Sequence, residues 1–176
     1  MANSIVYGMS GWWSGFFPPL RKPIELTLAA VKAKDRSIMC LDGTWHSWRK
    51  FADHLRDHEH VYRNVIVIGH SYGASAATKM ADDLYHDHIP IDLFLSLDQG
   101  LDSFIVTDKP IRSNVRIVDE WHVAYERLTL AADFTGEYNF YEHTFGPGSW
   151  MRHTSYFTQP DVVETLRDRI IEIASR

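Results

Sequence analysis

The feature of this sequence that most constrains its fold is the run "VIVIGHSYGAS" at residues 65–75. Four β-branched residues lead into Gly-His-Ser-Tyr-Gly, and alanine-rich sequence follows. β-Branched side chains favour extended backbone, whereas small side chains suit a helix that packs closely under a sheet. The run therefore predicts a buried strand that turns abruptly into a helix at Ser71, as in folds that alternate strands with helices.

The rest of the chain continues this alternation. Strands are expected at residues 4–9, 37–42, 64–69, 91–98 and 114–121, with a short one at 138–143. Helices are expected over residues 24–34, 45–56 and 72–85 and after Pro160. Several strands are apolar on both faces, as buried parallel strands must be. The pattern predicts a three-layer α/β/α sandwich with a mostly parallel sheet of about five or six strands.

Helical periodicity also predicts which faces are buried. In the first helix, Leu26, Ala29, Ala30 and Ala33 share one face. In the last helix, the apolar stripe contains Val162, Val163, Leu166, Ile170 and Ile173. We expect both stripes to pack against the sheet.

Composition narrows the class of protein. With 176 residues, of which 45% are hydrophobic, residues 1–176 suit a single domain with its own core. A net charge of -5 argues against a nucleic-acid partner, which requires clustered Lys and Arg. The one cysteine, Cys40, has no intrachain partner, and no long apolar run indicates a leader or a membrane span. We expect a cytoplasmic protein.

The Gly-x-Ser-x-Gly sequence around Ser71 has a mechanical logic. A serine at a sharp strand-to-helix turn projects its hydroxyl from the strand end, and glycines at 69 and 73 remove β-carbons that would collide in that turn. The N–H of Tyr72, at the helix start, would face a developing oxyanion. The alternative interpretation is a glycine-rich turn in which Ser71 merely caps the helix.

Three motifs, "VIVIGHSYGAS", "IDLFLSLDQG" and "RHTSYFTQPDVV", together resemble the α/β-hydrolase superfamily of serine esterases, lipases and thioesterases, in particular its small lidless members. The resemblance extends from the first strand to the end of the chain. It implies that Ser71 is the nucleophile, followed in chain order by a carboxylate and a histidine base. Gln99 stands where related sequences commonly have proline.

Two histidines and two carboxylates compete for the remaining catalytic positions. The resemblance places the base at His153, ahead of the last helix, and His143 is the alternative. Asp98 ends a predicted strand at the carboxyl edge of the sheet, and Asp119 is its competitor. The weaker candidates are Glu120 and Asp102 for the acid, while His70 and His122 are interpreted as packing residues.

The loops near the predicted site supply the remaining candidates. Besides Tyr72, the oxyanion hole would take the N–H groups of Met9 and Ser10, with Gly8 and Gly11 letting the backbone approach. Trp12 and Trp13 either cover the core or line a substrate pocket, and Trp45, on the next strand-end loop, would add a wall to that pocket.

The predicted function is hydrolysis of a small-molecule carboxylic ester or thioester through an acyl-enzyme on Ser71. This chemistry requires no metal and no organic cofactor. One alternative is a non-catalytic α/β-hydrolase-like binding or scaffold protein. Another is a metal-dependent hydrolase that uses the histidine clusters "DHEH" and "HDH".

Overall fold

The structure is a computed structural model that describes residues 4–11, 22–99, 109–123, 128–143 and 154–176. Its strands are β1 (Ser4–Ser10), β2 (Ile38–Thr44), β3 (Asn64–Ser71), β4 (Leu93–Gln99), β5 (Ile117–His122) and β6 (Glu137–Glu142). Its α-helices are α1 (Lys22–Lys34), α2 (Trp48–His58), α3 (Tyr72–His86) and α5 (Pro160–Ala174). Short 3-10 turns are η2 (Trp45–Ser47), η3 (Glu59–Val61) and η4 (Tyr156–Thr158).

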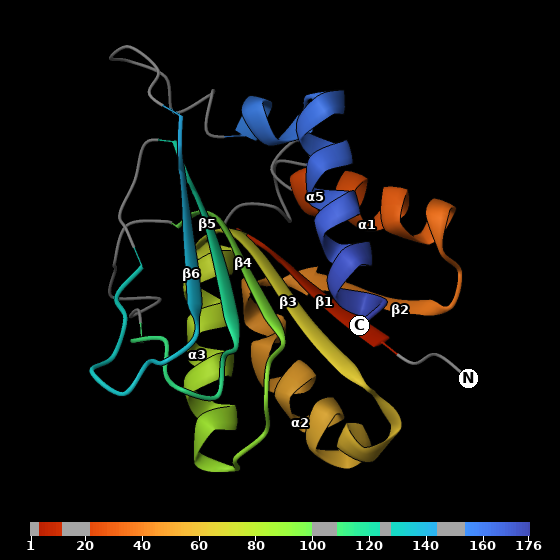
Figure 1. The fold of residues 1–176 in the computed structure, drawn as a ribbon. Helices are drawn as coiled ribbons and strands as arrows, with labels where there is room; N and C mark the ends of the chain where they lie inside the picture. The colour runs from red at the N-terminus through yellow and green to blue at the C-terminus, as the bar shows by residue number, and fades with distance from the viewer. Residues whose placement is uncertain (1–3, 12–21, 100–108, 124–127, 144–153) are drawn as a thin grey trace.

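All neighbouring strands of the sheet run parallel, in the order β2-β1-β3-β4-β5-β6. Helices α1 and α5 cover one face, and α2 and α3 cover the other (Figure 1). The predicted three-layer α/β/α sandwich is confirmed, with six strands.

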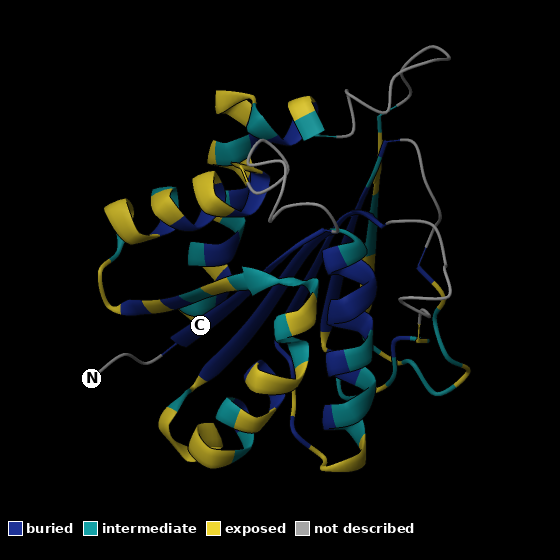
Figure 2. Cartoon of the chain, turned by 180° about the vertical axis from the view of Figure 1, so that it is seen from behind, coloured by how far each residue is buried: buried dark blue, intermediate teal, exposed yellow. Residues whose placement is uncertain are grey.

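The core has two halves, one on each face of the sheet. Along β3, Val67 belongs to the half under α2 and α3, whereas Ile66 and Ile68 belong to the half under α1 and α5. All three are fully buried. In Figure 2 the central strands are dark blue and the outward helix faces are yellow. Apolar residues on both faces of a strand are therefore the correct signature of this buried parallel sheet.

The predicted inner face of α1 is wrong. The buried residues of α1 are Pro23, Ile24, Thr27, Leu28 and Val31, whereas Leu26 is 40% exposed. A β-carbon on Gly8 of β1 would lie 2.6 Å from Ile24 and 2.8 Å from Leu28, so α1 docks with these branched side chains above Gly8. Branched side chains bury more apolar area than alanines, which explains the choice of face.

The direction of strand addition reverses between β1 and β3. The chain passes from β1 to β2 on one side and then returns to place β3 on the other side of β1. In an open parallel sheet, ligands bind at the carboxyl ends of the strands where such a reversal occurs. The ends of β1 and β3 therefore form the expected location of a site.

Helix length bears on membrane association. Helices α3 and α5 have 15 residues each, whereas a bilayer span takes about 20. Within the described ranges, no helix has the length and apolar character that would let it cross a membrane.

Candidate active site

Ser71 is the last residue of β3 and directly precedes α3. Its backbone has φ 58° and ψ -132°, a conformation that residues other than glycine rarely adopt. Such strain persists only where the surrounding structure enforces it, and it concentrates at functional sites. The backbone of Ser71 therefore has the strained strand-to-helix turn that the sequence predicts.

Both glycines of the motif are required by close backbone contacts. A β-carbon on Gly69 would lie 2.5 Å from Cα of Ala74, in the first turn of α3. A β-carbon on Gly73 would lie 2.0 Å from the carbonyl oxygen of Met9, in β1. The turn thus packs directly against its own helix and against the neighbouring strand.

The sign of the stability change in Gly73→Ala tests this packing. In an unobstructed helix, Gly→Ala stabilises by about 0.5–1 kcal/mol. Here the new methyl group collides with backbone that cannot rotate away, so we expect a fall of about 1–3 kcal/mol in the free energy of unfolding. Urea denaturation of the variant and the wild type measures the difference. A more stable Gly73→Ala variant would contradict the contact with Met9.

The end of β1 lies beside the Ser71 side chain. A β-carbon on Gly11 would lie 3.1 Å from Oγ of Ser71, so the backbone at Gly11 passes close to the hydroxyl. Met9 and Ser10 are the last two residues of β1, which extends one residue beyond the predicted strand, and the Ser10 hydroxyl donates to the carbonyl of Gly43 at 3.0 Å. Gly8 faces α1 rather than this site.

Asp98 occupies a bulge beside Ser71. The register of β3 and β4 shifts so that His70 pairs with Leu97 and Ser71 pairs with Gln99, leaving Asp98 as the extra residue. Asp98 has φ 49° and is 1% exposed. Bulges redirect a side chain at the edge of a sheet, and they recur beside active sites. Two residues with positive φ therefore lie next to each other at the carboxyl edge.

The carboxylate of Asp98 is held by the end of β5. The N–H of Val123 donates to Oδ1 of Asp98 at 2.9 Å. Nδ1 of His122 lies 3.9 Å from the same oxygen. His122, interpreted from the sequence as a packing residue, is therefore a neighbour of the candidate acid.

Asp119, the competing acid, is engaged in a buried structural ion pair. It is 1% exposed, and Nε of Arg169 in α5 donates to its Oδ2 at 2.7 Å. Nδ2 of Asn139 donates to its Oδ1 at 2.9 Å. Both oxygens are thus occupied by residues that tie α5 and β6 to β5.

Of the two weaker acid candidates, Glu120 is buried in the fold. Glu120 is also 1% exposed, and it accepts hydrogen bonds from the N–H of Leu128 at 3.1 Å and the hydroxyl of Tyr138 at 2.6 Å. It therefore serves as an acceptor inside the fold. Asp102 lies outside the described residues.

His153 also lies outside the described residues. The segment that follows it in sequence is anchored beside the Ser71 turn, because the buried ring of Phe157 contacts that of His70, with centroids 5.7 Å apart. His70 is fully buried there as a packing residue.

His143, the alternative base, is held by aromatic rings. Its own ring stacks on Trp121 at 5.8 Å and lies 4.5 Å from the ring of Tyr156, centroid to centroid. Burial lowers the pKa of His143. These contacts place the ring on the face of the sheet that carries α5, since Trp121 and Tyr156 belong to that half of the core.

Comparison with solved structures identifies the fold. No protein-family model matches the sequence, and no curated protein matches it. Solved structures do match. Human thioesterase 2 is 11% identical with a TM-score of 0.63, over 99% of this chain and 97% of that chain. The chain has the α/β-hydrolase fold.

Two further structures with this fold show the same relation. The thioesterase domain SrfTE, described for cyclization of the lipopeptide antibiotic surfactin, is 11% identical with a TM-score of 0.58, over 98% of this chain and 92% of that one. An α/β-hydrolase superfamily protein from Enterococcus faecalis is 10% identical with a TM-score of 0.52, over 99% and 91%. At such identities the likeness establishes the fold and leaves the chemistry to the site.

The tryptophans predicted to line a pocket are only partly placed. Trp45, in η2, is half-buried, packs on the core half under α2 and α3, and lies 3.5 Å from the His46 ring, centroid to centroid. This contact gives Trp45 a role in covering the core of the hydrolase fold. Trp12 and Trp13 lie outside the described residues.

The histidine clusters do not form a metal site in the described part of the hydrolase fold. His86 and His88 are exposed at the carboxyl end of α3. Within residues 4–11, 22–99, 109–123, 128–143 and 154–176, no three His, Cys, Asp or Glu side chains gather as metal ligands.

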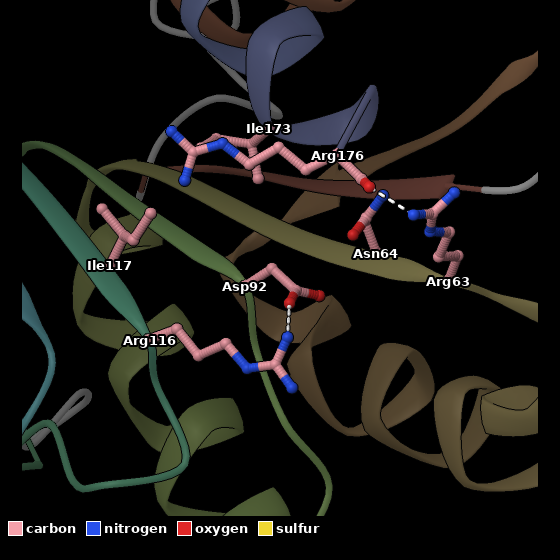
Figure 3. Close-up of a pocket in the computed structure, with 7 residues that line it drawn as sticks. All are labelled: Arg63, Asn64, Asp92, Arg116, Ile117, Ile173 and Arg176. Atoms are coloured by element: carbon pink, nitrogen blue, oxygen red, sulfur yellow. Dashed lines mark hydrogen bonds and ion pairs between the residues drawn. The ribbon is translucent and has the colours of Figure 1, made fainter.

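A cavity of about 350 Å³ lies at the opposite edge of the sheet, where β3 and β5 begin. Figure 3 shows Asp92 and Arg116 paired across it, with Arg116 donating to Asp92 at 2.5 Å. Arg63 donates to the carbonyl oxygen of Arg176. Because the cavity is at the amino edge and its charged groups serve structural bonds, it is separate from the Ser71 site.

Proposed function

We propose that this protein is a serine hydrolase that cleaves a carboxylic ester or thioester through an acyl-enzyme formed on Ser71. The observation that carries the proposal is the strained backbone of Ser71 at the end of β3, with Gly11 lying against its hydroxyl. A reactive serine must project from a sharp turn into space that a substrate carbonyl can enter.

The proposed reaction has two steps. His153 takes the hydroxyl proton of Ser71 while Oγ attacks the substrate carbonyl, and then returns this proton to the leaving group. In the second step His153 activates water, which hydrolyses the acyl-enzyme and regenerates the serine. Asp98 orients the imidazole and stabilises its charged form.

Backbone donors would stabilise the oxyanion in both steps. Tyr72 is the first residue of α3, where the helix dipole favours negative charge, and its N–H would be one donor. The second donor comes from the end of β1, where Met9 and Ser10 are the sequence candidates. Gly11 joins them as a candidate, since a β-carbon on Gly11 would lie 3.1 Å from Oγ of Ser71.

Two contrasts support the assignment of acid and base. Asp98 lies in the bulge beside Ser71, whereas Asp119 is committed to Arg169. The segment after His153 contacts the residue preceding Ser71, whereas His143 is packed between aromatic rings. Both contrasts favour the triad of Ser71, Asp98 and His153.

Thioesters are included in the proposal because several solved structures with a similar fold are described as thioesterases. Oxygen esters and thioesters differ in leaving group but share the acyl-enzyme, so this chemistry accommodates both. A panel of short-chain acyl esters paired with thioesters of the same acyl group would separate acyl preference from leaving-group preference.

A fluorophosphonate probe tests the nucleophile directly. We expect stoichiometric labelling of the wild type at Ser71, no labelling of Ser71→Ala, and full labelling of Ser155→Ala, in which an exposed serine is removed. Cys40 is not a competing nucleophile, because it is 7% exposed and burial raises its pKa to about 11.

The other outcomes identify the alternatives. A folded wild type that takes no label would favour the scaffold protein. Turnover that survives in Ser71→Ala but disappears with a chelator would favour the metal-dependent hydrolase.

A further inference from the structure

His122 presents an unsatisfied polar atom to the candidate acid. Its Nδ1 is buried and has no hydrogen-bond partner among the residues that the structure describes. This Nδ1 lies 3.9 Å from Oδ1 of Asp98, and the Asp98 side chain is 0% exposed. A buried polar atom without a partner is costly, so its retention calls for an explanation.

This geometry favours one tautomer of His122. If Nδ1 carried a lone pair, it would face a carboxylate oxygen, and two acceptors would repel each other at 3.9 Å. With hydrogen on Nδ1, the N–H faces negative charge that burial has removed from water. The distance exceeds that of a hydrogen bond, but a shift of about 1 Å would form one.

Several contacts fix the position of the His122 ring. The ring lies against Phe140 of β6 with centroids 5.9 Å apart, and the carbonyl of His122 accepts the N–H of His143 at 2.9 Å. The next residue, Val123, donates its N–H to Oδ1 of Asp98. Two consecutive residues at the end of β5 thus face the same carboxylate oxygen, one through its side chain and one through its backbone.

We propose that His122 is a positioning residue for Asp98. This inference rests on the proposed function, since it concerns the carboxylate of that triad. The Nδ1–H of His122 and the N–H of Val123 hold Oδ1 on the β5 side. Held in this way, the carboxylate keeps one orientation toward the imidazole of the base through both steps.

Strand spacing separates this role from that of the base. His122 is on β5 and Ser71 ends β3, with β4 between them. Two strand spacings amount to about 9.6 Å, which a histidine and a serine side chain bridge poorly across the intervening strand. His122 is therefore placed to act on Asp98 of the adjacent strand rather than on Ser71.

A matched pair of variants tests the role through turnover. In His122→Asn, the amide N–H2 replaces Nδ1–H at nearly the same position, whereas His122→Leu has a similar shape without a donor. We expect His122→Leu to lower kcat about 10-fold with KM unchanged, and His122→Asn to remain within about 3-fold of the wild type. In the Asp98→Asn background, His122→Leu should cause no further loss, because the two residues act as a unit.

Three results would overturn the inference. One is full turnover in His122→Leu. Another is a 10-fold loss that persists unchanged in the Asp98→Asn background. The third is a loss as large as that of Ser71→Ala, which would make His122 the base. Thermal denaturation of each variant separates these losses from unfolding.

Nitrogen NMR of the imidazole provides a readout that does not depend on activity. In ¹⁵N-histidine-labelled protein, we expect His122 to carry hydrogen on Nδ1, and we expect this signal to shift in Asp98→Asn. A lone pair on Nδ1 would overturn the inference even in an active enzyme. If the wild type neither hydrolyses esters nor reacts with the fluorophosphonate, the proposed function fails, and the NMR result still decides the contact between His122 and Asp98.

Discussion

Ser71→Ala is expected to lower kcat/KM for ester or thioester hydrolysis by about four to six orders of magnitude. The reason is that this variant loses the nucleophile, so the acyl-enzyme cannot form, and the oxyanion donors and the binding surface alone provide only weak catalysis. Steady-state turnover of the best substrate in the panel measures the loss, and circular dichroism checks that the fold is retained.

The strain at Ser71 supplies a matched control. Glycine adopts φ 58° and ψ -132° without strain, whereas alanine has a β-carbon, as serine does, and keeps the strain. Ser71→Gly should therefore be as inactive as Ser71→Ala but more stable, by about 1 kcal/mol in the free energy of unfolding. A Ser71→Ala variant that retains a tenth of wild-type turnover would remove Ser71 from the reaction.

The strand-to-helix turn could be predicted because the residues that set its backbone are local in sequence. Gly69 contacts Ala74, and the β-branched run precedes the turn directly. The order of strands and helices was predictable for a similar reason, since periodicity is set within each segment. The contacts of Gly73 with Met9 and of Ser71 with Gly11 bring in a distant part of the chain, and these could not be predicted.

The surroundings of the acid could not be predicted, since they depend on how strands register with one another. The bulge at Asp98 exists only because β4 pairs with β3 in a shifted register. The approach of His122 to Asp98 requires β5 to lie next to β4. Asp119 and Arg169 are 50 residues apart, and neither has a sequence signal that identifies the other as its partner.

The buried face of α1 could not be predicted, for a different reason. Two apolar stripes are present on that helix, one rich in alanine and one containing Ile24, Leu28 and Val31. Both stripes have helical spacing, so periodicity does not show which one is buried. The choice is made by the space above Gly8, which fits Ile24 and Leu28 and which belongs to another element.

Asp98→Asn and Asp119→Asn should separate catalysis from stability. We expect Asp98→Asn to lower kcat by about 10⁴-fold, because an amide orients the imidazole in the wrong tautomer, with little change in stability since Val123 keeps an oxygen acceptor. Asp119→Asn should leave kcat within about threefold. It removes the buried charge partner of Arg169, which keeps the more exposed Glu172 and Glu137, at a cost of about 3 kcal/mol in the free energy of unfolding.

Paired measurements of kcat and urea denaturation decide between the two carboxylates. Both measurements are needed for both variants, because a loss of turnover could arise from lost catalysis or from unfolding. If Asp119→Asn removes turnover at a temperature where the protein remains folded, and Asp98→Asn does not, then the acid is Asp119. The contact of Asp119 with Arg169 would then have to open during the reaction, since Arg169 occupies one carboxylate oxygen and Asn139 the other.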